Sequence, residues 1–218
     1  MSNFISNNIP QVFSNHLRYA SSYEEALYLS YQSLFNDLIK SSIDITFSGS
    51  TAVTCFLRGK DLKVANSGDS RCIIGCHRNN LWGLKEITKD HKPNVETEEA
   101  RIIESGGRVE SYCTDYGEFL GPLRVWLKDE NIPGLAMTRS IGDLVASTVG
   151  VSWEPGIIFR LTKLEVTKYT IHENDKFLIV ASDGVWEFLD NKQVTKIIAI
   201  YYMRNDIEGA CDELMNQA

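Results

Sequence analysis

The chain has 218 residues, 43% of them hydrophobic, which suits one globular domain with a large buried core. A net charge of −7, without any run of basic residues, argues against binding to the phosphate backbone of nucleic acids. No segment approaches the ~18 consecutive apolar residues of a membrane-spanning helix, so the composition argues against a membrane protein as well.

The first predicted helix begins at Ser22, where "SYEE" has the spacing of a capping box between Ser22 and Glu25. Apolar residues at helical spacing follow from Leu27 to Leu38. The segment before this helix, "MSNFISNNIPQVF", has neither the basic start nor the apolar core of a signal peptide.

A series of short β-rich runs comes next, separated by the turn clusters "RGKD", "SGD" and "HRNN". Such a series predicts a meander of antiparallel strands. The runs "AVTCFL" and "RCIIGC", and the later run "FLIVAS", are apolar on both faces, which indicates strands that are covered on both sides. The sequence therefore predicts an α+β fold, a four-layer α-β-β-α sandwich of two antiparallel sheets flanked by helices.

A helix is predicted from Val95 to Ser105, with Ala100 and Ile103 on its apolar face and two glycines after its end. The segment 111–143 contains prolines and several glycines and is predicted to be irregular. A strand at Phe177 leads to a helix whose capping box, "DNKQ", starts at residue 190. A last helix, "DIEGACDELMNQA", follows.

The five cysteines do not have the spacing of a zinc site. We interpret them as reduced core thiols of a protein located in the cytoplasm or nucleus. They are Cys55, Cys72, Cys76, Cys113 and Cys211.

Two aspartates stand just past strand-like runs, Asp69 in "VANSGDSR" and Asp183 in "IVASDGVWE". Hard cations such as Mg²⁺ and Mn²⁺ need several carboxylate oxygens brought together from separate strands. Glu187 would share a side with Asp183 if a helical turn begins there. The competing interpretation is structural, because Asp beside Gly is a common turn pair, and Asp143 in "RSIGD" is open to the same two interpretations.

The histidines do not support nucleophilic catalysis. His91 in "TKDHKPN" reads as a turn residue, and His16, His77 and His172 have no acidic or cysteine residue nearby in the sequence. A Ser-His-Asp triad therefore has no support.

Five ordered motifs resemble the metal-dependent serine/threonine protein phosphatases of the PP2C (PPM) family. They are "SGSTAV", "VANSGDSR", "ITKDHKPNVETEEARIIESGGRV", "RVWLKDENIPGLAMTRSIGD" and "FLIVASDGVWEFLDNKQV", and they extend over about 48–194. The resemblance implies a central β-sandwich and a dinuclear Mg²⁺ or Mn²⁺ centre that activates water to hydrolyse phosphoserine or phosphothreonine. A phosphoprotein substrate is the partner it implies.

The resemblance also assigns roles to residues. Asp183, with Gly184, matches the motif that binds the catalytic metals, and Asp69 matches an aspartate that helps to hold a third metal. Glu187 stands where the family usually has Asp, and it differs by one methylene. Two residues match family motifs with structural roles, Asp143 and Arg71. The loop from Tyr112 to Pro133 corresponds to the flap beside the family's active site.

The sequence departs from the family at both ends. The "DGHG" motif with its general-acid histidine, the upstream phosphate-binding arginine and the final Asp-Asn pair are absent, so no catalytic residue is assigned. Residues 1–218 are thus expected to be a single, partial phosphatase domain. We expect that the dinuclear site does not form at ordinary Mg²⁺ levels, and that unpaired strands promote oligomers.

These features predict a hydrolase, a PP2C-type protein phosphatase, of which this chain is an inactive fragment. The alternative is a non-catalytic PP2C-like pseudophosphatase that binds partner proteins. An unrelated sandwich with coincidental Asp turns does not account for five motifs in order.

Overall fold

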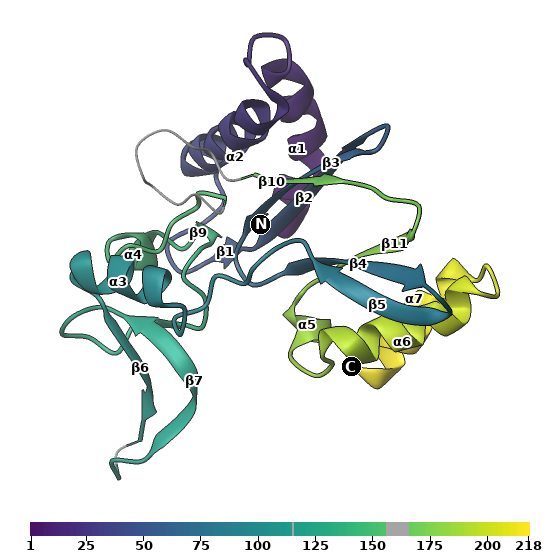
Figure 1. The fold of residues 1–218 in the computed structure, drawn as a ribbon. Helices are drawn as coiled ribbons and strands as arrows, with labels where there is room; N and C mark the ends of the chain where they lie inside the picture. The colour runs from purple at the N-terminus through teal and green to yellow at the C-terminus, as the bar shows by residue number, and fades with distance from the viewer. Residues whose placement is uncertain (115, 156–165) are drawn as a thin grey trace. The chain divides into compact units, whose positions relative to one another are not determined.

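The computed structural model describes residues 1–114, 116–155 and 166–218 (Figure 1). The chain forms two compact units. One contains Met1–Ala52, Ser67–Asp69 and Asp90–Val166, and the other contains Val53–Asn66, Ser70–Lys89 and Thr167–Ala218.

The first unit begins with a hairpin of two helices, α1 (Ser2–His16) and α2 (Tyr23–Lys40), which pack together. The Ser22 side chain caps α2 as predicted, accepting a hydrogen bond from the Glu25 N–H at 3.1 Å. The Glu25 carboxylate, however, accepts from the backbone N–H of Ser21 rather than from that of Ser22. The first bond of the predicted capping box is therefore present, whereas the second is made by the residue before Ser22.

The rest of the first unit contains two small antiparallel sheets and two helices. The sheets are β1–β9 and β6–β7–β8, and α3 contacts β6. The bounds are β1 (Gly49–Ser50), α3 (Glu96–Glu104), β6 (Arg108–Cys113), β7 (Phe119–Trp126), β8 (Pro133–Leu135), β9 (Ile141–Gly142) and α4 (Leu144–Ser147).

These elements correct two predictions. The segment from Ser111 to Asp143 is not irregular throughout, because it contains β7, β8 and β9. The buried face of α3 is also not the predicted one, since Ala100 is exposed and Ile103 is 52% exposed. Instead, Ile102 is fully buried and forms a core with residues that include Val125, Ala146, Val149 and Val151.

The second unit consists of two stacked three-stranded antiparallel sheets, with strand orders β10–β3–β2 and β11–β4–β5. Apolar side chains from both sheets form one core cluster that includes Leu62, Val64, Cys72 and Ile74. The bounds are β2 (Ala52–Arg58), β3 (Asp61–Ser67), β4 (Arg71–Arg78), β5 (Leu81–Glu86), β10 (Thr167–Thr170) and β11 (Asp175–Ala181).

Helices cover the other face of the β11–β4–β5 sheet (Figure 1). They are α5 (Asp183–Trp186), α6 (Asn191–Tyr202) and α7 (Ile207–Gln217). Ile73 and Ile179 of the sheet pack in one cluster with Val194 of α6 and Leu214 of α7. The predicted capping box of α6 is present, with Asp190 accepting from Gln193 N and Gln193 accepting from Asp190 N, each at 2.8 Å.

The predicted meander is not continuous. β2 adjoins β3 in one sheet and β4 pairs with β5 in the other, so the chain changes sheets at the turn around Gly68. The result is the predicted combination of stacked antiparallel sheets with helices. Among the described residues, no helix is both long and apolar enough to cross a membrane.

All five cysteines lie in the described part of the chain, and all are free. The Sγ atoms of Cys55 and Cys72 are 3.9 Å apart in the core between the sheets. Cys113 and Cys211 are exposed, so the prediction of core thiols is wrong for these two.

Candidate metal-site turns

The turn after β3 carries Asp69, whose side chain is 5% exposed. Its carboxylate Oδ2 accepts from the Lys92 ammonium group at 3.0 Å. Gly68, just before it, has a φ of +105°, and a Cβ there would lie 2.4 Å from the Thr51 side chain. A glycine is therefore required both by the backbone conformation and by the close approach of Thr51.

His91 fastens this turn and is buried. Its backbone N–H donates to the Gly68 carbonyl at 3.1 Å, and the Gly68 N–H lies 3.1 Å from His91 Nδ1. Burial, reinforced by the charge of Arg139, lowers the pKa of His91 to about 4. The imidazole is therefore neutral near pH 7 and can accept from Gly68. In the structure, His91 therefore contacts the backbone of the turn at Gly68.

A buried ion cluster supports the same region. The Arg139 guanidinium donates to both carboxylate oxygens of Glu98, at 2.6 Å and 3.0 Å, and Arg101 adds a bond at 2.8 Å. Burial alone would raise the pKa of Glu98, but the two guanidinium groups hold it well below its usual range. Thr138 donates its hydroxyl to Glu98 and its backbone N–H to the His91 carbonyl, which connects the cluster to the turn.

Asp183 is the first residue of α5 and directly follows the end of β11 and Ser182. The predicted helical turn is present, because the Glu187 N–H donates to the Asp183 carbonyl at 2.8 Å. Asp183, Gly184 and Glu187 are all exposed. Buried Trp186, in the same turn, donates its indole N–H to the Ala181 carbonyl at 2.8 Å and so fixes the turn against the strand.

Asp143 is buried and adopts a left-handed conformation with a φ of +48°. A Cβ on Gly49 would lie 2.0 Å from Asp143 Oδ2, so the carboxylate packs directly on the glycine backbone of β1. Burial raises the pKa of Asp143, and the Ser140 hydroxyl opposes this shift. The Asp143 N–H donates to the Ser48 carbonyl at 2.8 Å, which joins this residue to the segment before β1.

These donors do not by themselves make a complete metal centre. Within 1–114, 116–155 and 166–218, no three His, Cys, Asp or Glu side chains come together in a metal-binding group. The Asp69 carboxylate is paired with an ammonium group, and Asp183 and Glu187 come from a single turn. A hard cation prefers six or more oxygen ligands, so the residues present do not fit a dinuclear centre.

The family model described as Protein phosphatase 2C matches residues 1–218. The chain belongs to the PP2C family. The predicted resemblance is confirmed, and the match covers a longer part of the chain than the five motifs do. The PP2C family is metal-dependent in general.

Curated relatives of this PP2C chain include Probable protein phosphatase 2C 12 from Oryza sativa subsp. japonica, 40% identical over 73% of the chain and 38% of the relative. Probable protein phosphatase 2C 72 from Arabidopsis thaliana is 35% identical over 82% of the chain and 50% of the relative. The chain therefore spans half or less of the length of these relatives.

Solved structures share the fold. The serine-threonine phosphatase 2C from Toxoplasma gondii has a TM-score of 0.76 at 20% identity, covering 98% of this chain and 75% of that one. A C. elegans sex determining protein has a TM-score of 0.71 at 21% identity, covering 92% of this chain and 44% of that one. The predicted fold class is confirmed.

Arg71 of the PP2C chain, in the "GDSR" motif, makes contacts inside the second unit. Its guanidinium donates to Asn191 Oδ1 at the start of α6 and lies 5.1 Å from the centroid of the Trp186 ring. The Asn191 amide also donates to Glu86 of β5 at 2.7 Å. Arg71 thus ties β4 to the turn that carries Asp183.

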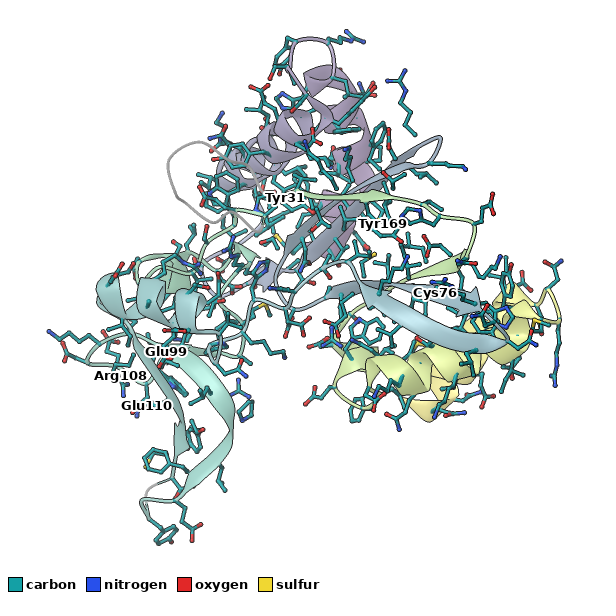
Figure 2. The ribbon with its side chains drawn as sticks, in the orientation of Figure 1. Tyr31, Cys76, Glu99, Arg108, Glu110 and Tyr169 are labelled. Atoms are coloured by element: carbon teal, nitrogen blue, oxygen red, sulfur yellow. The ribbon has the colours of Figure 1, made fainter. Side chains whose placement is uncertain are left out.

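The flap-like segment, predicted as a loop from 112 to 133, contains much of the β6–β7 hairpin; residue 115 lies outside the described residues. Figure 2 shows Arg108 and Glu110 of β6, whose side chains form an ion pair. Near the tip, Tyr112 and Phe119 are 48% and 66% exposed. The hairpin therefore presents aromatic side chains at its surface.

Sequence reasoning did not identify Lys92, Glu98 or Arg139 as site residues. Lys92 adjoins His91, but its partner Asp69 lies 23 residues earlier. Glu98 and Arg139 are 41 residues apart, and their pairing depends on the packing of α3 against the segment before β9. Knowing that Asp69 and Glu98 are buried would have indicated that each needs a cationic partner, but a single sequence does not show which charged residues are buried.

Proposed function

We propose that this chain is part of a metal-dependent protein phosphatase that hydrolyses phosphoserine and phosphothreonine, with Mg²⁺ or Mn²⁺ as the activating ion. The observation that carries the proposal is the match of the Protein phosphatase 2C family to all 218 residues. The relatives with 35–40% identity are named protein phosphatases, which supports the same activity. Because the chain spans half or less of those relatives, the activity is proposed for the protein of their full length.

The geometry of the two Asp turns supports this proposal. Asp69 and Asp183 each stand just past the end of a strand, on backbone fixed by hydrogen bonds from buried residues, His91 and Trp186 respectively. A carboxylate in such a position is held without the entropy loss of a free loop when it takes part in a site. Exposed Asp183 and Glu187 leave their oxygens accessible to an ion or to water.

The test is release of phosphate from a phosphothreonine peptide by the full-length protein, with Mn²⁺ present. We expect Mn²⁺-dependent turnover that falls at least about 100-fold in Asp183→Ala, since removing one charged ligand of a catalytic site costs several kcal/mol. Asp212→Ala, an exposed carboxylate of α7, is the matched control and should keep full activity. Normal turnover in Asp183→Ala would overturn the proposal.

The alternative is a pseudophosphatase that binds partner proteins without hydrolysis. The pairing of Asp69 with Lys92 favours it, because that carboxylate is neutralised without an ion. The two candidates differ in one measurement: a pseudophosphatase binds a phosphopeptide but releases no phosphate at any Mn²⁺ concentration.

We further propose that the protein resides in the cytoplasm or nucleus, and that it oligomerises through exposed strands. Five free cysteines support the proposed location, because they are consistent with a reducing compartment. The exposure of Leu178 and Val180 of β11, 42% and 47%, supports the proposed association. A fluorescent fusion that entered the secretory pathway would contradict the proposed location.

A further inference from the structure

Two cysteine side chains meet in the core between the stacked sheets of the second unit. Cys55 belongs to β2 and Cys72 to β4, and their Sγ atoms lie 3.9 Å apart. Cys72 is fully buried in the cluster that contains Leu62 and Ile74, and Cys55 packs against the same cluster. The two thiols are therefore held against each other between the sheets.

A bond between these sulfur atoms needs a small movement. A disulfide S–S bond is about 2.05 Å long, so the two atoms must approach by roughly 2 Å. In the described part of the chain, β2 stands at the edge of its sheet, in the order β10–β3–β2, whereas β4 lies between β11 and β5. An edge strand has ladder hydrogen bonds on one side only, so β2 can yield more readily than β4. Disulfides that join two stacked antiparallel sheets occur in immunoglobulin domains, so the arrangement is sterically possible.

The two thiols differ in their surroundings. Cys55 is partly exposed, whereas Cys72 is fully buried. Contact with the Cys72 thiol lowers the pKa of Cys55, and the same contact, together with burial, raises the pKa of Cys72. Because the thiolate is the form that attacks an oxidant, Cys55 is placed to react first, with Cys72 beside it as the second thiol.

We propose that Cys55 and Cys72 are an oxidation site, at which hydrogen peroxide converts the two thiols into a disulfide that fastens β2 of one sheet to β4 of the other. The Cys55 thiolate attacks one oxygen of the peroxide, the O–O bond breaks, and the departing hydroxide takes up the Cys55 proton as water. The Cys72 sulfur then attacks the sulfur of the Cys55 sulfenic acid. The S–S bond forms, the S–O bond breaks, and the Cys72 proton leaves with the hydroxide as a second water. The two sulfur atoms together lose two electrons, which the peroxide gains.

The bridge goes beyond the proposed function, because it forms whether or not the protein hydrolyses phosphate. In a reducing compartment such a disulfide is transient, since cellular thiols reduce it again. Cys76 is not an alternative partner for Cys72: it lies four residues further along the same strand, a distance of about 13 Å.

The experiment uses the 218-residue chain with Cys113→Ser and Cys211→Ser, which removes the exposed thiols that could link two chains. The folded protein is treated with hydrogen peroxide, the remaining thiols are alkylated, and unreduced peptides are mapped by mass spectrometry. We expect one linked pair of peptides, Cys55 with Cys72, which has lost the mass of two hydrogens and which dithiothreitol separates. Adding Cys76→Ser is the matched control and should leave the yield of this pair unchanged.

Cys55→Ser and Cys72→Ala should each abolish the linked pair, and circular dichroism establishes that each variant is folded. The mapping itself needs neither variant, so it decides the proposal even if one of them does not fold. Because the bridge joins residues 17 positions apart, the oxidised chain should melt at least about 5 °C above its dithiothreitol-treated form. Unmodified thiols after treatment, sulfinic acid at Cys55 without a linked peptide, a bridge to Cys76, or an unchanged melting temperature would each overturn the proposal.

Discussion

His91 is a side chain of the first unit that fixes backbone. It is 8% exposed, and both its ring and its backbone N–H contact Gly68. His91 Nδ1 lies 3.1 Å from the Gly68 nitrogen and 3.0 Å from the Gly68 carbonyl oxygen, so the unprotonated nitrogen accepts from the N–H, whereas a protonated one donates to the carbonyl. Protonation therefore changes the bond that His91 makes to the turn, and it also places a charge on a buried ring, which is unfavourable.

This dependence predicts a loss of stability in mild acid. The pKa of His91 is about 4 in the folded chain and about 6.5 when unfolded, so the unfolded state binds more protons between these values. Stability is then fully present above pH 6.5 and falls as the pH drops towards 4, by about 2 kcal/mol at pH 5. Urea denaturation across this range should show the slope in the unaltered chain.

His91→Gln supplies the control, because glutamine does not titrate. Its stability should be lower near pH 7 but flatter from pH 6.5 to 4. Glu98 contributes in a different window: its pKa is lowered in the folded chain, so its contribution is lost only below the unfolded pKa of about 4.3. An equal slope in His91→Gln between pH 6.5 and 5 would refute the assignment to His91.

At the scale of elements, the sequence predicts what local interactions determine. The helices at Ser22 and Asp190 have side-chain caps, and both begin where predicted. The helix α1 was missed because its N-cap, Met1, makes no side-chain bond and Pro10 lies inside it. The strand β7 was missed because Pro122 interrupts its pattern, in a stretch where the pairing with β6 shifts register.

In the candidate site, too, features set by local sequence were predicted and features set by tertiary contacts were not. The Asp turns were predicted from their place after strands, since the Gly beside each Asp is a local signal. The partners of those turns were not predicted, because Lys92 reaches Asp69 only once the chain has turned back on itself. The buried face of α3 was misassigned for a related reason: Arg139 neutralises Glu98, so a charged residue lies on the buried side.

The strand β11 yields a prediction about association. It stands at the edge of its sheet and pairs with β4. Ile179 packs under α6, and the alternating residues Leu178 and Val180 are 42% and 47% exposed. An apolar edge strand is a template for pairing with another chain, so we expect self-association that Val180→Lys weakens.

Sedimentation velocity over a concentration series measures this effect. Leu81→Lys is the matched control, because Leu81 is 73% exposed but begins β5, on the other edge of the same sheet. It should leave association unchanged. A monomer at all concentrations, or equal weakening by both substitutions, would exclude β11 as the contact.

At the scale of the whole chain, 29 acidic residues outnumber 22 basic ones, yet three of the buried or half-buried carboxylates are each paired with a lysine or an arginine. Asp69 is paired with Lys92, Glu98 with Arg139, and Asp175 with Lys85 at 2.8 Å. Acidity alone therefore does not create a cation site, which needs carboxylates that converge without counter-charges.

Removal of metal should thus leave the stability of this chain almost unchanged. An ion that binds only the folded state adds RT ln(1 + [L]/Kd): at 1 mM Mg²⁺, two sites with a Kd of about 10 μM would add about 5 kcal/mol, whereas a Kd above about 10 mM adds less than about 0.1 kcal/mol. We expect the second case, because the donors present do not converge. Thermal melts in EDTA and in 1 mM Mg²⁺ should then coincide within about 0.5 °C, while the first case would separate them by about 10 °C or more. A separation of that size would mean that this chain assembles the dinuclear centre by itself, and the expectation of an incomplete site would be wrong.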